Sequence, residues 1–138
     1  MKAYVCRGYG GPDVLELKNV PTPTPKDDEI LIKVCATTVT AADWRVRTIN
    51  VPKGLGLVAR LALGLTRPRQ PILGTELAGI IETAGKDVTR FKPGDAVFAF
   101  PGGKMGCHAQ YGVVAENGPV VNKPENLTFE EADSLTFG

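Results

Sequence analysis

The strongest candidates for metal binding in this 138-residue sequence are its one histidine, His108, and the preceding cysteine, Cys107. A catalytic zinc ion needs three protein ligands drawn from cysteine, histidine and carboxylates, with one position left open. Adjacent residues on a strand point to opposite faces, so these two side chains are poorly placed to bind one ion together. No nucleophile–base pair is visible either, because a Ser-His-Asp arrangement would depend on the single histidine. The pattern favours buried small thiols and a partly exposed histidine over a metal centre.

A second candidate is a phosphate-binding loop. The pattern Gly54-x-Gly56-x-x-Ala59 matches the dinucleotide fingerprint, and Glu76 lies about twenty residues further on. Such a fingerprint must directly follow a strand and open a helix, so that the pyrophosphate meets the helix N-terminus. Residues 51–53 read Val-Pro-Lys and do not form a buried strand. We therefore interpret the match as a chance recurrence.

The turn residues of the chain predict a β-rich domain. Sixteen glycines and eleven prolines separate short β-prone runs. The expected strands are residues 3–7, 14–20, 29–38, 77–83, 96–100, 109–114 and 120–122. Many short strands with few helices favour a barrel-like antiparallel core with irregular connections.

Three connections have local signals of their own. Pro93-Gly94 suits the two central positions of a type II turn. Residues 21–25 read Pro-Thr-Pro-Thr-Pro and should form an extended surface connection. Residues 53–66 are expected to form an apolar loop or short helix. Its apolar stripe would consist of Leu55, Val58, Ala62 and Leu65.

Two short helices are also expected. Asp43 is a candidate N-cap for a helical turn over residues 44–47. Thr128 and Glu131 have the spacing of a capping box at the start of the second helix. The chain stops at Gly138, about two turns later, and isolated helices this short are marginal. We therefore expect the polypeptide to continue.

Composition argues against several classes of partner. With 16 basic and 15 acidic residues and no basic cluster, a nucleic-acid partner is not expected. The most apolar stretch, residues 55–65, is shorter than a bilayer span and is interrupted by Arg60 and Gly64. Three widely spaced cysteines argue against a disulfide framework, and Met1 leads into a strand-like pattern without a signal peptide. A soluble cytoplasmic protein with no membrane partner is expected.

Residues 74–97 carry the most informative pattern. They read Gly-Thr-Glu-x-x-Gly, then Gly85, then Phe-Lys-Pro-Gly-Asp at 91–95. In this order they resemble the signature segment of the medium-chain dehydrogenase/reductase superfamily. The opening residues 1–3 and the runs at 10–15, 21–25 and 123–132 look like the corresponding places in quinone reductases. The resemblance covers nearly the whole chain. It implies the N-terminal catalytic domain of that superfamily, a mainly β, GroES-like, partly open β-barrel with a few short helices.

The resemblance also points to the zinc-free branch of that superfamily. In its zinc-dependent alcohol dehydrogenases, a histidine that binds the catalytic zinc stands between the Gly and the Glu, where this chain has Thr75. A second zinc ligand, a cysteine three residues before an aspartate, corresponds to Thr40 here. Two metal ligands are thus replaced by hydroxyls, and no metal site is expected. Glu76 is expected to hold a neighbouring arginine or backbone donors.

By the same resemblance, the segment around Thr40 lies beside the nicotinamide ring, and Thr40 takes the place of an asparagine that is common in zinc-free relatives. As a catalytic and cofactor-binding residue, Thr40 could orient a substrate carbonyl or a water. It could equally bond its own backbone at the end of a strand. Trp44 or Arg45 is expected to approach cofactor or substrate, with a buried Trp44 as the alternative. Asp43 is expected to be structural.

We therefore expect residues 1–138 to be the substrate-binding, catalytic domain of a zinc-independent oxidoreductase. Using NADPH or NADH, it would reduce quinones or conjugated enones by hydride transfer. The resemblance implies a Rossmann nucleotide-binding domain downstream, a homodimeric full-length protein, and a fragment that is inactive alone. It places residues 53–66 near the substrate entrance, although core packing explains them equally well. Two alternatives stay open: a non-catalytic interaction module on the same fold, and a zinc alcohol dehydrogenase with displaced ligands.

Overall fold

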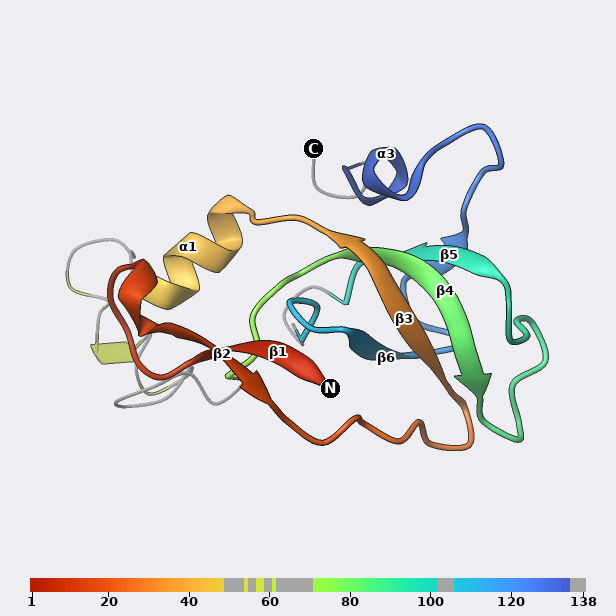
Figure 1. Cartoon of the computed structure of the whole chain (residues 1–138), viewed down its shortest axis with the longest axis horizontal. Helices are drawn as coiled ribbons and strands as arrows, with labels where there is room; N and C mark the ends of the chain where they lie inside the picture. The colour runs from red at the N-terminus through yellow and green to blue at the C-terminus, as the bar shows by residue number, and fades with distance from the viewer. Residues whose placement is uncertain (49–53, 55–56, 59–60, 62–70, 102–105, 135–138) are drawn as a thin grey trace.

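The computed structural model describes residues 1–48, 54, 57–58, 61, 71–101 and 106–134. Within these residues, strands form two antiparallel sheets (Figure 1). The small sheet pairs β1 (Lys2–Cys6) with β2 (Leu15–Asn19). The large sheet has the order β6-β3-β4-β5-β7. Its strands are β3 (Glu29–Thr37), β4 (Leu77–Ala84), β5 (Ala96–Ala99), β6 (Tyr111–Ala115) and β7 (Val120–Asn122).

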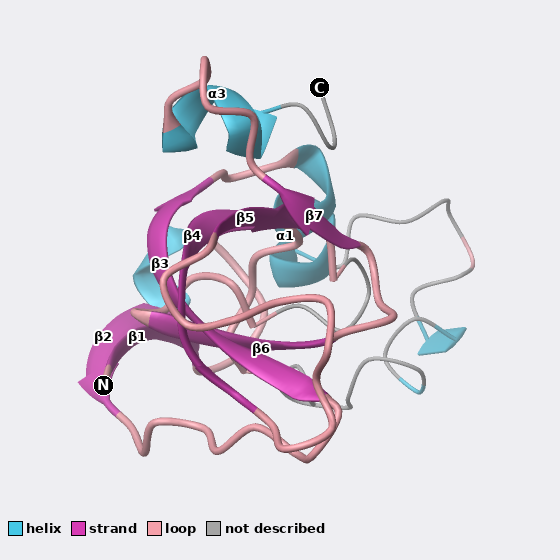
Figure 2. Ribbon diagram, turned by 90° about the vertical axis from the view of Figure 1, so that its right-hand side faces the viewer, coloured by secondary structure: helices cyan, strands magenta, loops and turns pink. Residues whose placement is uncertain are grey.

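The large sheet is curved, and the small sheet is joined to the segment that precedes β6. β3 shifts register against β4 at two places, and such irregularities bend and twist a strand. The N–H of Tyr4 donates to the carbonyl of His108, and the N–H of Gln110 donates to that of Lys2, both at 3.0 Å. β1 is therefore attached to the segment just before β6. The strands curve around a common interior and leave one side open (Figure 2). The predicted architecture, a mainly β, partly open barrel with a few short helices, is confirmed.

The core fills the concave side of the large sheet. β3 begins with a buried run and continues with alternating exposure, because only its first half is covered on both faces. Ile30 and Ile32 are fully buried. The other buried members of this cluster are Leu77, Ile81, Phe91, Val97, Ala99, Cys107, Val114 and Val120. The short helix α3 (Phe129–Ser134) contacts β3, β4 and β5.

Most local predictions are confirmed. Each predicted strand is present within two residues of its expected bounds. The N–H of Asp95 donates to the carbonyl of Lys92 at 3.1 Å, and Gly94 has a φ of 96°, as the type II turn requires. Residues 21–25 form no strand. The capping box is also present: Thr128 Oγ1 accepts from the N–H of Glu131 at 3.1 Å, and the carboxylate accepts in return at 3.2 Å.

One helix start was predicted wrongly. Helix α1 spans Ala41–Thr48, so its N-cap is Thr40 and not Asp43. Thr40 Oγ1 accepts from the N–H of Asp43 at 3.3 Å, and Asp43 Oδ2 accepts from the N–H of Thr40 at 2.9 Å. These reciprocal bonds form a capping box in which aspartate takes the place of the usual glutamate.

Two further predictions concern residues that are mostly not described. The glycine fingerprint and the apolar stripe of residues 53–66 lie outside the described residues, except at residues 54, 57–58 and 61. The 3-10 helix η1 (Pro12–Val14) lies between β1 and β2 in the chain. None of the described helices is long and apolar enough to cross a bilayer.

Candidate active site

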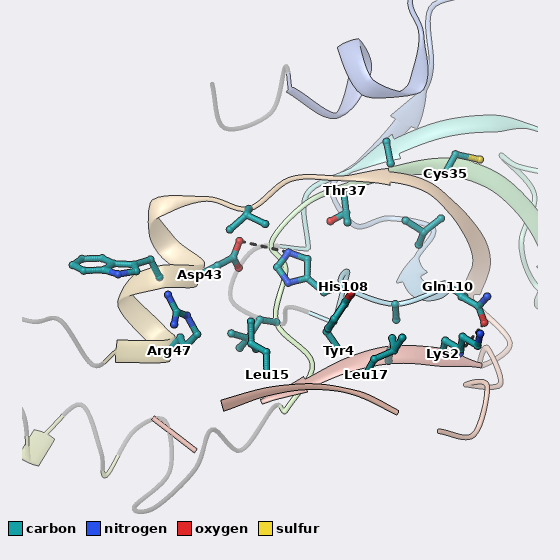
Figure 3. A pocket seen from close by; sticks show the side chains of 17 residues that line it. Lys2, Tyr4, Leu15, Leu17, Cys35, Thr37, Asp43, Arg47, His108 and Gln110 are labelled. Atoms are coloured by element: carbon teal, nitrogen blue, oxygen red, sulfur yellow. Dashed lines mark hydrogen bonds and ion pairs between the residues drawn. The ribbon is translucent and has the colours of Figure 1, made fainter. Parts of the chain in front are cut away.

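A cleft of about 630 Å³ lies between the small sheet, the second half of β3 and helix α1 (Figure 3). Its walls are mainly apolar. Four large apolar side chains that line it are exposed: Tyr4, Leu17, Val39 and Trp44. The polar lining residues are Lys2, Thr37, Asp43, Arg47, His108 and Gln110. A largely apolar cleft with a few convergent polar groups is the usual form of a small-molecule site.

Two of these polar residues meet in the cleft. His108 Nε2 lies 3.8 Å from Asp43 Oδ2 and 2.9 Å from the carbonyl oxygen of Thr38. Figure 3 shows the ring standing in the cleft with one nitrogen turned toward Asp43. Only 12% of the His108 side chain is exposed, and Asp43 is almost fully buried. A histidine and a carboxylate therefore share a protected position.

Asp43 is held by three hydrogen bonds in addition to this contact. Its Oδ1 accepts from the backbone N–H of Gly74 at 3.0 Å. Its Oδ2 accepts from both the N–H and the hydroxyl of Thr40, at 2.9 and 3.1 Å. A buried carboxylate needs such donors, since burial without them is costly. Asp43 therefore fixes the start of α1 against the turn before β4.

Gly74 allows His108 to approach this turn. Its φ is 103°, a backbone conformation that residues with a side chain rarely adopt. A Cβ atom at this position would lie 2.7 Å from Cδ2 of His108. Only a glycine lets the imidazole pack against the backbone at this distance. The first glycine of the Gly-Thr-Glu pattern thus serves the position of the histidine.

Two acidic side chains outside the cleft lining, Glu76 and Asp133, are also buried. Glu76 accepts a short hydrogen bond from the hydroxyl of Thr38, and its backbone carbonyl accepts from Thr37 Oγ1 at 2.8 Å. Burial and, to a smaller extent, the charge of Glu76 raise the pKa of Asp133 to about 7. Burial is also the main cause that raises the pKa of the Cys107 thiol, helped by the nearby carboxylates. The carboxylate of Glu76 thus accepts from a side-chain hydroxyl, that of Thr38.

The predicted site residues are placed around the start of α1. Thr40 caps that helix; its neighbours Val39 and Asp43 line the cleft, but Thr40 itself does not. Trp44 lines the cleft and is 44% exposed, so the buried alternative for this residue is wrong. Arg45 lies in α1, and its side chain is outside the described part of the structure.

Sequence reasoning missed the pairing of His108 with Asp43. It weighed His108 as a zinc ligand and as a member of a Ser-His-Asp arrangement, and it took Asp43 to be structural. These two residues are 65 positions apart in the chain, and no local pattern links them. The available signal was that the one histidine directly precedes a predicted strand.

Residues 26–125 match the alcohol dehydrogenase GroES-like domain. The chain belongs to this family. It is 36% identical to a chloroplastic quinone-oxidoreductase homologue of Spinacia oleracea, over 96% of this chain and 38% of that protein. It is 33% identical to the quinone oxidoreductase of Homo sapiens, over 98% of this chain and 37% of that protein.

Solved structures agree with the assignment to the GroES-like family. The quinone oxidoreductase of Coxiella burnetii superposes with a TM-score of 0.81 and 29% identity, over 98% of this chain and 40% of that chain. A mycobacterial protein solved in complex with NADPH gives a TM-score of 0.76 and 27% identity, over 99% of this chain and 38% of that chain. This GroES-like domain thus spans between 37% and 40% of the length of these relatives.

Proposed function

We propose that this chain is the substrate-binding domain of an oxidoreductase that reduces quinones or conjugated enones with NADPH or NADH, without zinc. The observation that carries the proposal is the mainly apolar cleft with His108 and Asp43 in it. Relatives named as quinone oxidoreductases support the reaction class.

The cleft fits a flat, weakly polar acceptor. Exposed apolar side chains are common singly, but here four of them surround one hollow. Tyr4 and Leu17 stand on the small sheet, while Val39 and Trp44 stand at the start of α1. An aromatic or conjugated ring placed between them would bury apolar surface on both faces.

The cofactor would lie at the start of α1. When bound, reduced nicotinamide supplies the hydride. The exposed ring of Trp44 offers a flat apolar surface to it, with Arg45 on the same helix. The single proton of the Thr40 hydroxyl is donated to Asp43, and one lone pair accepts from the N–H of Asp43. One lone pair of Thr40 is left, and it could accept from an amide N–H of the cofactor or from a water.

The residues at the two expected ligand positions do not fit zinc. Zinc in proteins takes thiolate, imidazole or carboxylate ligands. Thr40 and Thr75 present neutral hydroxyls, and that of Thr40 is already engaged in the helix cap. The hydroxyl of Thr75 is buried and has no hydrogen-bond partner among the described residues. These two positions therefore offer zinc no suitable ligand.

The cleft can be tested with one matched pair of variants in the protein that carries this chain. Leu17 lines the cleft and is 53% exposed, whereas Val121 is 49% exposed on β7 and does not line it. We expect Leu17→Glu to raise the KM for a benzoquinone at least tenfold, because a charge is placed against an apolar ligand. Val121→Glu should leave the KM unchanged. Equal effects of the two variants would place the substrate elsewhere.

Two controls separate the alternatives. A chelator should leave turnover of the wild-type protein unchanged; loss of activity that added zinc restores would instead support the zinc alcohol dehydrogenase. A wild-type protein that oxidises neither NADPH nor NADH with any quinone or enone tested would favour the non-catalytic interaction module.

A further inference from the structure

His108 has a free ring nitrogen inside the cleft. Its Nε2 faces the carbonyl oxygen of Thr38 at 2.9 Å. A carbonyl oxygen can only accept, so Nε2 must carry a hydrogen and donate it. In the neutral ring, the other nitrogen, Nδ1, then has an unprotonated lone pair. Nδ1 has no hydrogen-bond partner within the described residues, and Figure 3 shows this second nitrogen turned away from Asp43.

The ring is held on two sides and open on the third. Asp43 lies 3.8 Å from Nε2, and Gly74 lies against Cδ2, where a Cβ atom would clash at 2.7 Å. These contacts leave the edge with Nδ1 as the part of the ring that faces the lumen. The imidazole therefore has one fixed tautomer and one available nitrogen, which is the arrangement that a proton-transfer histidine needs.

Three other polar side chains of the cleft are already engaged. Arg47 Nη1 donates to the carbonyl of Gly10 at 3.0 Å, and Thr37 Oγ1 donates to that of Glu76 at 2.8 Å. Gln110 Oε1 accepts from the N–H of Lys2 at 2.7 Å. Unlike these three groups, His108 presents an available ring nitrogen, which accepts in the neutral ring and donates in the imidazolium.

We propose that His108 is the general acid of this site and gives its Nδ1 proton to the oxygen of the acceptor. This inference rests on the proposed reduction of a quinone or enone. When the acceptor gains hydride from the reduced nicotinamide, a new bond to hydrogen forms and the displaced electron pair collects on the carbonyl oxygen. The N–H bond at Nδ1 then breaks, an O–H bond forms, and the imidazolium becomes neutral. Water from the open side of the cleft returns a proton to Nδ1.

The pH dependence of turnover is influenced by every charged or titratable group around the ring of His108. Asp43 lies at the Nε2 side, and Arg47 lies on the same helix. The small sheet presents Lys2 and Tyr4, and β3 presents Cys35. Cys107 precedes the histidine in the chain, and Glu76 binds the hydroxyl of the same Thr38 whose carbonyl holds Nε2. Turnover should fall on the alkaline side as the imidazolium loses its proton, and this fall should disappear when the ring is removed.

Two substitutions separate proton transfer from binding. In His108→Gln, the side-chain amide can still donate to the Thr38 carbonyl, but nothing replaces Nδ1. In His108→Asn, the amide can donate a hydrogen bond near the Nδ1 position without transferring a proton. Both should lower kcat about a hundredfold, because neither side chain is a general acid. His108→Asn should keep the KM of the wild-type protein, and both should lose the alkaline fall. Melting temperatures check that each variant folds.

The imidazole ¹⁵N signals provide a readout that does not depend on turnover. The signals of His108 are assigned by their loss in His108→Gln. In the neutral ring, Nδ1 should have the shift of an unprotonated nitrogen, and adding a hydroquinone should move it, because the hydroxyl then donates to it. A neutral ring that carries its hydrogen on Nδ1, or an Nδ1 signal that does not respond to the hydroquinone, would overturn the proposal.

The failure of this proposal can be told apart from the failure of the proposed function. A wild-type protein that reduces quinones while His108→Gln keeps kcat and pH profile within twofold overturns only the role of His108. A wild-type protein that reduces no quinone or enone overturns both.

Discussion

The carboxylate of Asp43 and the backbone N–H of Gly74 are 3.0 Å apart, although 31 positions separate them in the chain. This bond joins the first turn of α1 to the turn before β4. The same carboxylate accepts two bonds from Thr40 and lies 3.8 Å from His108. The helix cap, the glycine turn and the histidine of the cleft therefore share one buried acceptor.

Replacing Asp43 with asparagine should destabilise the protein by about 2–4 kcal/mol. The oxygen that accepts two hydrogen bonds from Thr40 would be replaced by an NH2 group, which can only donate and would face the same two donors. Urea unfolding of the wild type and of Asp43→Asn measures the loss. Asp87→Asn is the matched control, since Asp87 is exposed and its carboxylate accepts no hydrogen bond from any described residue. If the two variants unfold at the same urea concentration, the carboxylate of Asp43 does not hold α1 against the turn before β4.

Gly74→Ala tests how closely the turn approaches His108. The added methyl group would lie 2.7 Å from Cδ2 and 2.8 Å from the backbone nitrogen of His108. Gly94→Ala is a matched control, because Gly94 has a similar φ of 96° and nothing within 4 Å of the added atom. Strain alone should cost about 1–3 kcal/mol in both proteins, and the clash should make Gly74→Ala clearly less stable. Equal losses would show that the turn moves aside without cost.

The strands and turns could be predicted because their signals are local. Proline and glycine mark the turn at residues 93–94, and the capping box needs only Thr128 and Glu131. The N-cap of α1 was misassigned because a threonine and an aspartate three positions apart can each cap a helix. The choice depends on Gly74, a partner outside the segment.

The geometry of the site could not be predicted for the same reason, because it depends on contacts between distant segments. The cleft forms where β1, β3 and α1 meet, and its histidine is attached to β1 by the backbone bond from Tyr4 to His108. Nothing near His108 in the chain indicates that Asp43 faces it. Likewise, Glu130 and Glu131 of α3 are exposed while Asp133 of the same helix is buried, a difference that depends on how the helix lies on the sheet.

The three cysteines should differ sharply toward a thiol reagent. Cys35 is exposed and lines the cleft, whereas Cys6 and Cys107 are buried. Burial raises the pKa of both buried thiols, which lowers their thiolate fraction. One of the chain's thiols should therefore react rapidly in the native protein and all three in denaturant, as followed by absorbance. Cys35→Ser should remove the fast phase; if a fast phase remains, one of the buried sites opens readily.

Asp133 should make the protein less stable as the pH rises from about 4 to about 7. The folded state keeps the proton of this buried carboxyl up to a pKa of about 7, whereas the unfolded chain loses it near the ordinary value of 3.8. Between these values the unfolded state binds fewer protons, so the free energy of unfolding falls with pH. Below both pKa values this carboxyl takes nothing from the free energy of unfolding, and above both of them the full loss applies. It amounts to at most about 4 kcal/mol.

The measurement is the difference in unfolding free energy between wild type and Asp133→Asn at a series of pH values. The difference should be small at pH 4 and should increasingly favour Asp133→Asn up to about pH 7, because the amide is neutral throughout. The contributions of other titratable groups cancel in this difference, because both proteins contain them. One is Glu116, whose pKa is lowered by the backbone N–H groups of Arg90 and Thr89. Glu130→Gln, at an exposed position of α3, should show no such trend. A pH-independent difference for Asp133→Asn would mean that Asp133 is ionised in the folded protein across this range.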